Sequence, residues 1–320
     1  MRNTNTLPEG TRVGDYAIED LLGSGGFGMT YRAHDRQLKS PVAIKEYFPA
    51  DLARRGPDYT VETRPDGVAG GYGWGLDKFE QEGKALAQLQ HPNIVGINHL
   101  FHANGTAYIV LDLIKGPSLS QWLAGIKRSI TQAEADDLVF PLVNALEAVH
   151  HKGLMHRDIA PKNIMIAPGF TPILIDFGTV RQLVAQKSQT LYAVLTPGYA
   201  PIEQYAAKSS QQGPWTDIYS LGATLYEAIS GRKPPEAMER SLDDHCVPAS
   251  EVGRGRFRAE FLTALDWALK PLPKDRPQNV AMWREALARG MPANAPAMIF
   301  LPPRPQSPQP TKRTRWFGLG

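Results

Sequence analysis

Two short apolar runs near the middle of the chain carry polar residues at their edges, and this stretch constrains the fold most. Asp158 and Asn163 precede the run at residues 164–166, and Asp176 follows the run at residues 172–175. If the two runs form neighbouring strands, the three polar side chains can converge on one point. Carboxylate and amide oxygens are ligands that suit Mg²⁺, and a further carboxylate can orient a hydroxyl group. The stretch therefore predicts a site with the groups that phosphoryl transfer requires.

A glycine-rich segment lies between two strand-like stretches, residues 16–22 and 30–33. Gly23, Gly25 and Gly28 have no Cβ, so the backbone there can approach a phosphate group closely. Taken alone, the same spacing also fits a plain tight turn or a dinucleotide-binding loop. A dinucleotide-binding fold requires a helix that opens on the last glycine, and this sequence shows strand character there. We therefore expect a β-hairpin with a glycine-rich flap.

A lysine and a glutamate follow on two further predicted elements. Lys45 ends the strand-like run at residues 42–45, and Glu82 lies in a stretch of helical periodicity at residues 77–90. A lone Lys on a strand or a lone Glu on a helix is ordinarily a solvated surface residue. The stretch between them, residues 50–76, contains several Pro and Gly residues and predicts an irregular loop insertion.

The order and spacing of these motifs resemble the protein kinase family, and most closely its bacterial eukaryotic-like Ser/Thr group. The resemblance rests on the glycine flap, Lys45 and residues 154–166, 176–178 and 196–203, and it covers roughly residues 16–289. It implies an α+β fold of the bilobal protein-kinase type, with a small β-rich N-lobe and a larger, mostly helical C-lobe.

The same resemblance divides the chain into regions. We expect an N-terminal lead-in at residues 1–11, a kinase domain at 12–290, and a Pro-rich, disordered tail with a basic end at 291–320. Within the domain, the N-lobe would cover about 12–111, the hinge about 112–116 and the C-lobe about 117–290.

The resemblance also implies an activity, which is transfer of the γ-phosphoryl group of ATP to Ser or Thr hydroxyls of proteins. Autophosphorylation and a role in bacterial signalling belong to the same expectation. Asp158 would orient the incoming hydroxyl and accept its proton. Lys45, held by Glu82, would grip the α- and β-phosphates, and Lys162 would neutralise the moving phosphoryl group.

ATP and a divalent ion are the expected cofactors. Asn163 and Asp176 would hold Mg²⁺, with Mn²⁺ as a substitute. The residues expected to contact the nucleotide lie in the flap, the sheet, the hinge and the floor of the cleft, and they are Gly23, Ser24, Gly25, Gly26, Phe27, Gly28, Thr30, Ala43, Lys45, Leu111, Asp112, Ile114 and Met165.

Other residues receive structural roles from the resemblance. Asp217 should be a buried carboxylate that steadies the loop at residues 156–158, and Glu203 should pair with Arg276. A column that links the two lobes should be formed by Phe177, His156, Leu86 and Ile97.

The activation segment, residues 179–202, contains three candidate phosphorylation or docking residues, Ser188, Thr190 and Thr196. Arg157 stands next to the catalytic Asp and could pair with a phosphate placed on this segment. Ordinary loop polarity explains Ser188 and Thr190 equally well.

The sequence departs from the family pattern in ways that affect function. Ala160 stands where the family usually has Lys, and Lys162 follows two residues later, which we expect to supply the missing charge. Ile202 stands where the activation segment usually has Pro. The Ala160 position keeps open a pseudokinase that binds nucleotide or a partner without efficient transfer. A small-molecule kinase of the aminoglycoside type is disfavoured because residues 196–203 resemble a segment that docks a polypeptide.

Composition sets broad limits on partners and location. The formal net charge of +3 is too small to imply a nucleic-acid partner, and the single Cys246 excludes an intrachain disulfide. The sequence contains no apolar run of about 18 residues that could span a membrane. We expect a cytoplasmic protein, either free or as the cytoplasmic part of a membrane-anchored parent. Membrane contact would need such a parent or the basic residues 312–317, and dimerisation is left open.

Overall fold

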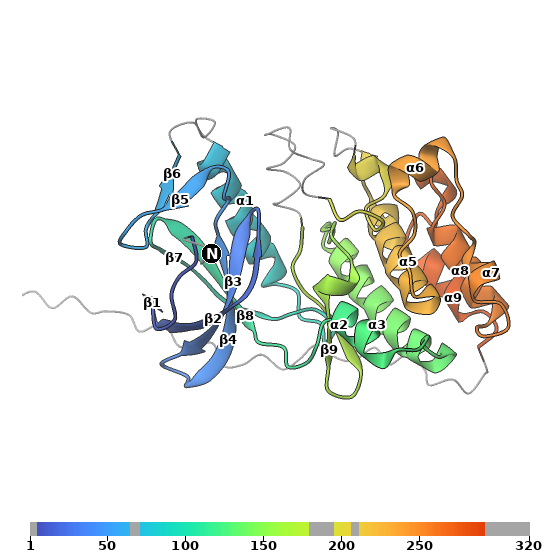
Figure 1. Ribbon diagram of the computed structural model, residues 1–320, viewed down its shortest axis with the longest axis horizontal. Coiled ribbons are helices and arrows are strands. Elements are labelled where there is room, and N and C mark those ends of the chain that lie inside the picture. Colours follow the sequence, from blue (N-terminus) through green and yellow to red (C-terminus); the bar gives the residue numbers. More distant parts are fainter. Residues whose placement is uncertain (1–4, 65–70, 179–194, 206–210, 292–320) are drawn as a thin grey trace, which may run out of the picture.

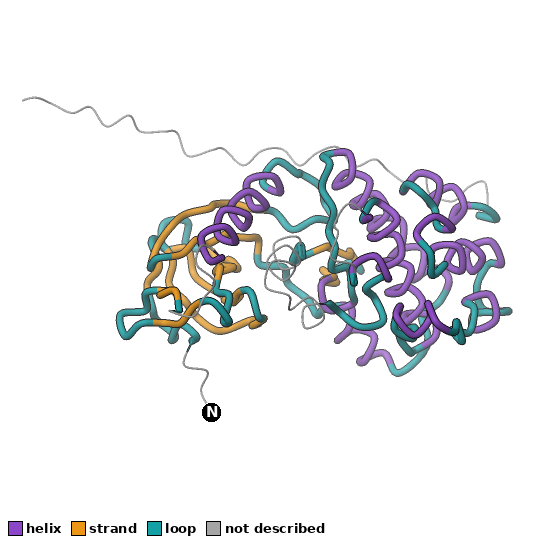
Figure 2. The backbone as a smooth tube through the Cα atoms, turned by 90° about the horizontal axis from the view of Figure 1, so that it is seen from above, coloured by secondary structure: helices purple, strands orange, loops and turns teal. Residues whose placement is uncertain are grey.

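The computed structural model describes residues 5–64, 71–178, 195–205 and 211–291, which form two lobes (Figure 1). The N-lobe is built on a six-stranded antiparallel sheet, and the C-lobe is mostly helical. In the perpendicular view, the strands of this sheet lie at one end of the molecule and most of the helices at the other (Figure 2). The expected α+β, bilobal fold is confirmed.

The large sheet has the strand order β1-β2-β3-β4-β8-β7. Its strands are β1 (Arg12–Val13), β2 (Tyr16–Gly25), β3 (Gly28–Asp35), β4 (Ser40–Tyr47), β7 (Ile97–Ala103) and β8 (Thr106–Asp112). Strands β2 and β3 form the expected glycine-rich hairpin, in which Gly25 pairs with Gly28. A Cβ on Gly28 would lie 2.5 Å from the Glu46 carbonyl oxygen, so the close approach of the flap to β4 requires a glycine there.

The two faces of this sheet are covered by different parts of the chain. Alternate residues of a strand point to opposite faces. On one face, Ile44 and Val110 pack against Leu7 of the N-terminal segment and against Val61. On the other face, aromatic and aliphatic side chains pack against Phe79 of helix α1 (Gly71–Leu86). The central strands β4 and β8 are therefore covered on both sides, and β4 carries a polar residue toward each side.

The structure corrects the prediction of an irregular insertion at residues 50–76. Strands β5 (Ala53–Arg55) and β6 (Val61–Thr63) pair as a short hairpin, while residues 65–70 lie outside the described part of the chain. Three-residue strands are too short to show a period-two pattern in the sequence. Leu7, in the expected lead-in, is buried against the same face of the sheet as this hairpin.

The predicted bounds of the N-lobe helix, residues 77–90, are also wrong. Helix α1 begins at Gly71 and ends at Leu86. Glycine disfavours a helix by about 1 kcal/mol relative to alanine, which is why the Gly-rich start reads as loop. Packing overrides this preference, because the Tyr72 ring lies 5.3 Å from the ring of Tyr47 in the sheet.

The C-lobe is a helical body with a small hairpin beside its connections to the N-lobe. Its helices are α2 (Leu119–Ile126), α3 (Gln132–His151), α5 (Pro214–Ser230), α6 (Ala237–Leu242), α7 (Ala249–Val252), α8 (Ala259–Ala268) and α9 (Val280–Ala288), with short 3-10 turns at η1 (Pro161–Asn163), η3 (Ile202–Gln204) and η5 (Pro273–Asp275). The hairpin is formed by β9 (Ile164–Ala167) and β10 (Thr171–Leu174). Thr131 caps α3 in a capping box with Glu134, and the helix continues through Pro141. No helix in the described residues is long and apolar enough to cross a membrane.

Backbone contacts join the lobes on either side of the β9–β10 hairpin. The Val95 N–H donates to the Leu174 carbonyl at 3.0 Å, and the Leu174 N–H donates to the Asn93 carbonyl at 2.8 Å. At the other side, Gly116 has φ of 135°, and a Cβ there would lie 2.0 Å from the Ile166 carbonyl oxygen. The connection between the lobes therefore requires glycine at position 116.

A buried ion pair ties the end of the activation segment to the C-lobe. Arg276 Nη1 lies 2.8 Å from Glu203 Oε1, and both side chains are inaccessible to solvent. The Thr216 hydroxyl donates to the same oxygen at 2.9 Å, and the Arg276 guanidinium lies over the Tyr219 ring.

Replacing Arg276 with Met should lower the free energy of unfolding by about 3–5 kcal/mol, because it leaves the Glu203 carboxylate buried without its cation. Arg128→Met is the matched control, since the Arg128–Glu134 pair is largely exposed, is screened by solvent and should contribute much less to stability. Denaturant unfolding of both variants checks this. Equal losses would contradict a special role for the buried pair.

Candidate active site

The β9–β10 hairpin brings two of the predicted site residues together. Ile164 pairs with Leu174, so Asn163 precedes one strand at the place where the other strand ends. The Ile175 N–H then donates to the Asn163 carbonyl at 3.0 Å. Asp176 follows directly, with φ of 57°, and turns away from the hairpin. The spacing of these residues in the sequence thus becomes proximity in space.

The carboxylate of Asp158 lies at the centre of a hydrogen-bonded group. It accepts a hydrogen bond from Asn163 Nδ2 at 2.8 Å and one from the Thr196 hydroxyl at 2.7 Å. Lys162 Nζ donates to the same hydroxyl oxygen at 3.1 Å and lies 3.9 Å from Asp158 Oδ2. Ala160 is buried and brings no charge to this group. The cation beside Asp158 therefore comes from Lys162, four residues further along the chain.

Lys45 and Asp176 meet across the gap between the lobes. Lys45 Nζ lies 2.5 Å from Asp176 Oδ1, and both side chains remain partly exposed. The partner predicted for Lys45 was Glu82, which is half-buried on α1. Burial lowers the pKa of the Arg157 guanidinium, while the charges of Asp217 and then Glu82 act to raise it. The Lys45–Glu82 pair stays a prediction.

The loop that carries Asp158 is held by a buried carboxylate on α5. Asp217 accepts hydrogen bonds from the backbone N–H groups of His156 at 2.9 Å and Arg157 at 2.8 Å. His150 Nε2 donates to it at 2.8 Å. Burial alone would raise the pKa of Asp217, but these interactions, led by the hydrogen bond from His150, outweigh burial and keep the pKa below its usual range. The carboxylate therefore stays charged and fixes the loop, in which Arg157 has φ of 67°.

His156 links this loop to the hairpin and to Phe177. Its Nε2 lies 3.1 Å from the Ile175 carbonyl, which can only accept, so Nε2 carries the proton and donates. Its Nδ1 accepts a hydrogen bond from the Asp158 N–H at 3.3 Å. Burial lowers the pKa of His156, which favours the neutral form. The ring centroids of His156 and Phe177 lie 4.4 Å apart. Leu86 and Phe177 are buried in one apolar cluster, and Ile97 packs against it, as expected for the predicted column.

Gly178 lies where the loop after Asp176 approaches the loop that carries Asp158. Its N–H donates to the His156 carbonyl at 2.8 Å. A Cβ on Gly178 would lie 2.7 Å from the Asp158 Cβ, a distance that side-chain rotation cannot relieve. The loop after Asp176 therefore needs a glycine to reach this position.

The residues predicted to contact the nucleotide gather on the sheet and at the connection between the lobes. Thr30 pairs with Lys45, and Ala43 pairs with Leu111, on adjacent strands. The flap residues lie on the β2–β3 hairpin, where the Phe48 N–H donates to the Phe27 carbonyl at 3.1 Å. Further along, Asp112 ends β8, Ile114 follows in the connection, and Met165 bridges to Ser118. Their contacts with a nucleotide stay a prediction.

Two of the activation-segment candidates, Ser188 and Thr190, lie outside the described residues, and only Thr196 is placed. Two contributors to the site were missed by the sequence analysis. Gln204 Nε2 donates to the Arg157 carbonyl at 2.8 Å, and His150 binds Asp217. His150 resembles an ordinary cation at a helix end, so the sequence gives no signal for its buried partner.

The side chains at the site fit a divalent ion bound together with phosphate oxygens. Asn163 uses its Nδ2 for hydrogen bonds within the loop, so the amide oxygen is its available ligand atom, and Asp176 supplies a carboxylate. No group of three His, Cys, Asp or Glu side chains suited to a metal occurs among the described residues. Mg²⁺ typically takes one or two carboxylates plus phosphate oxygens and water, which matches this sparse set.

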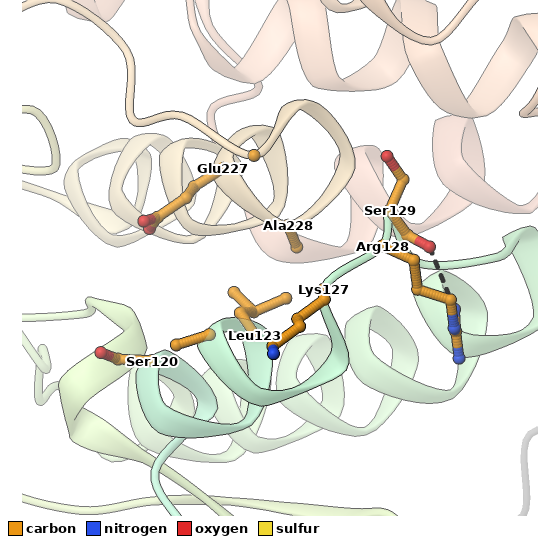
Figure 3. Close-up of a pocket in the computed structure, with 9 residues that line it drawn as sticks. Ser120, Leu123, Lys127, Arg128, Ser129, Glu227 and Ala228 are labelled. Carbon is orange, nitrogen blue, oxygen red and sulfur yellow. Dashed lines mark hydrogen bonds between the residues drawn. The ribbon is translucent and has the colours of Figure 1, made fainter.

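A separate hollow of about 560 Å³ lies in the C-lobe between α2 and the end of α5 (Figure 3). Lys127 and Arg128 line it from one side and Glu227 from the other, where Glu227 also accepts a hydrogen bond from the Tyr199 hydroxyl. None of the predicted catalytic or nucleotide-binding residues lines this hollow.

Gly178→Ala should lower the free energy of unfolding by about 1–3 kcal/mol, because the added methyl group overlaps Asp158. Gly125→Ala in α2 is the control, because a Cβ there meets no atom within 4 Å and alanine favours a helix. Thermal unfolding should show a lower midpoint for the first variant and an unchanged or higher midpoint for the second. A Gly178→Ala protein as stable as its parent would contradict the close contact.

Comparisons with known proteins agree with this geometry. Residues 16–277 match the family model described as Protein kinase domain. Serine/threonine-protein kinase PknA of Mycobacterium tuberculosis (strain ATCC 25177 / H37Ra) is 31% identical over 233 residues, covering 70% of this chain and 48% of that protein. The probable serine/threonine-protein kinase PknB of Bifidobacterium longum (strain NCC 2705) is 30% identical over 243 residues, which are 72% of this chain and 32% of that protein.

A solved structure titled "PpkA-294 apo form" has a TM-score of 0.80 and 39% sequence identity, and the match covers 88% of this chain and 99% of that one. The chain thus spans about a third to a half of the length of these curated relatives but nearly all of the solved structure. From the matched residues and the arrangement of Lys45, Asp158 and Asp176, the chain belongs to the protein kinase family.

Proposed function

We propose that the chain is an ATP-dependent serine/threonine protein kinase that acts in bacterial signalling. Membership of the family implies ATP, a divalent metal ion and a protein substrate, and we propose Mg²⁺ as the ion because the ligand atoms are oxygens. The same proposal includes autophosphorylation and a place in the cytoplasm.

One observation carries this proposal. The Asp158 carboxylate accepts a hydrogen bond from an alcohol hydroxyl, that of Thr196, at 2.7 Å. This is the distance from which a general base can take a proton from a hydroxyl group. Lys162 Nζ donates to the same oxygen, so a cation stands beside the place where negative charge would develop.

The mechanism then follows from the positions of the side chains. Asp158 orients the hydroxyl of a substrate Ser or Thr and accepts its proton. Lys162 stabilises the negative charge on the transferred phosphoryl group, and Lys45 binds the phosphates that remain on the nucleotide. Asn163 and Asp176 would hold the metal ion, which supplies charge neutralisation at the phosphates. Catalysis is positioning plus electrostatics, without a covalent intermediate on the enzyme.

Purified protein incubated with labelled ATP, Mg²⁺ and a generic basic protein should transfer label to Ser and Thr. Asp158→Asn and Lys45→Met should each reduce the rate by a factor on the order of 10²–10³, since each removes a charge that acts on the reacting groups. Mass spectrometry of the parent and of Lys45→Met identifies the modified residues. A pseudokinase would show no transfer, with the parent and both variants alike.

Lys162→Met should lower kcat about 10–100-fold with a smaller change in KM for ATP, because the lost charge acts mainly in the transition state. Lys152→Met is the control, since Lys152 is an exposed cation at the end of α3. Steady-state kinetics of both variants checks this. Unchanged turnover in Lys162→Met would contradict the view that Lys162 replaces the usual lysine at position 160.

A further inference from the structure

A second charged residue of β4 lies directly behind Lys45. Adjacent residues on a strand point to opposite faces of the sheet, so Lys45 faces Asp176 while Glu46 faces the other side. Glu46 is fully buried there, beside the apolar cluster formed with the N-terminal segment and the β5–β6 hairpin. A buried carboxylate needs several hydrogen-bond donors to remain charged.

Both oxygens of Glu46 are fully used. Arg55 binds in a two-point contact, with Nη1 at 3.0 Å from Oε1 and Nη2 at 2.6 Å from Oε2. The Tyr108 hydroxyl donates to Oε1 at 2.6 Å, and the Tyr31 hydroxyl donates to Oε2 at 3.2 Å. We call Glu46, Arg55, Tyr31 and Tyr108 the Glu46 network. Burial acts to lower the pKa of the Arg55 guanidinium. The hydrogen bonds and the charge of Glu46 outweigh burial and raise the pKa of Arg55 above its usual value.

The Glu46 network joins four segments of the N-lobe. Tyr31 comes from β3 and Tyr108 from β8, the two strands that flank β4, and Arg55 comes from the β5–β6 hairpin. The N-terminal segment adds two contacts. Arg55 Nε donates to the Asn5 carbonyl at 2.6 Å, and the Leu7 N–H donates to the Tyr31 hydroxyl at 3.1 Å.

Stability alone is a weak explanation for this arrangement. A buried ion pair is often no more stabilising than well-packed apolar side chains of the same volume. Its two-point geometry, however, fixes the position of the groups it joins, because the planar guanidinium and the carboxylate fit in one orientation. The residue held in this way is the immediate neighbour of Lys45.

We propose that Arg55 is a positioning residue for phosphoryl transfer, which acts through Glu46 to hold β4 where Lys45 reaches the phosphates of ATP. This inference rests on the proposed kinase function. It assigns a role to the β5–β6 hairpin and to residues Asn5 and Leu7, which complete the support behind the strand. A displacement of about 1 Å at a reacting group can reduce turnover about 10²-fold, so a small shift of β4 has a measurable effect.

The test compares two neighbouring arginines of the same hairpin. Arg55→Met should raise KM for MgATP about 10-fold and lower kcat/KM for MgATP about 10–100-fold, with little change in KM for the protein substrate. Arg54→Met is the matched control, because Arg54 forms an exposed ion pair with Glu62 on the same strand pair. Rates are expressed per folded molecule, measured well below the unfolding midpoint of each variant. A purely structural role would lower the folded fraction and leave KM for MgATP unchanged, which would overturn the inference.

Two milder variants keep the test decisive if Arg55→Met does not fold. Arg55→Lys retains the charge without the two-point contact, and Tyr108→Phe removes one donor while the ion pair remains. Both should raise KM for MgATP, by less than the Met variant.

Two truncations test the N-terminal contacts. Removal of residues 1–7 should raise KM for MgATP as the two milder variants do, whereas removal of residues 1–4 retains Asn5 and Leu7 and should leave KM for MgATP unchanged. Parent-like KM values in all of these variants would overturn the inference.

Calorimetric titration with a non-hydrolysable ATP analogue and Mg²⁺ separates the two proposals. A parent protein that binds the analogue but transfers no phosphate defeats the proposed function, and weaker binding in Arg55→Met than in Arg54→Met still supports the role of Arg55. An active parent with equal affinity and equal KM for MgATP in the two Met variants keeps the proposed function and refutes the role of Arg55.

Discussion

The buried carboxylate of Asp217 is the interaction on which the catalytic loop depends. It receives two backbone N–H groups from the loop and the ring of His150, so the loop is fixed from within the C-lobe core. That fixation permits the positive φ of Arg157, a conformation that a free loop would rarely hold. Asp158 follows Arg157 directly, so the backbone that carries the Asp158 side chain is positioned by Asp217, which has no part in the chemistry. The precision of the site thus derives from the helical core rather than from the loop sequence.

Strand β4 brings a cation from the N-lobe to this fixed site. Lys45 reaches Asp176 from one face of the strand, and the opposite face is anchored by Glu46. A flexible lysine side chain can move, but the strand that carries it is held by its neighbours on both sides and by the buried network behind it. The position of Lys45 therefore depends on the strands that flank β4 and on the buried network behind it.

The sequence predicts those features that depend on short-range order. The glycine hairpin follows from local pattern. So does the approach of Asn163 to Asp176, because only the tight β9–β10 hairpin lies between them. The start of α1 and the β5–β6 hairpin could not be predicted, since Gly-rich helices and three-residue strands depend on tertiary packing for their existence. The pairing of Arg55 with Glu46 is also invisible in the sequence, where Arg54 and Arg55 look like equivalent surface cations.

The position of Lys162 is the reason we propose that the departure from the family motif at Ala160 leaves the chemistry unchanged. Transition-state stabilisation depends on where a charge lies in space and not on its place in the chain. In this loop Lys162 lies in the short 3-10 turn Pro161–Asn163 and contacts Thr196, while the small Ala160 is buried. Lys162 therefore bonds to the hydroxyl that also bonds to Asp158. Ala160 brings no charge to this group, and the cation that lies beside the Thr196 hydroxyl is that of Lys162.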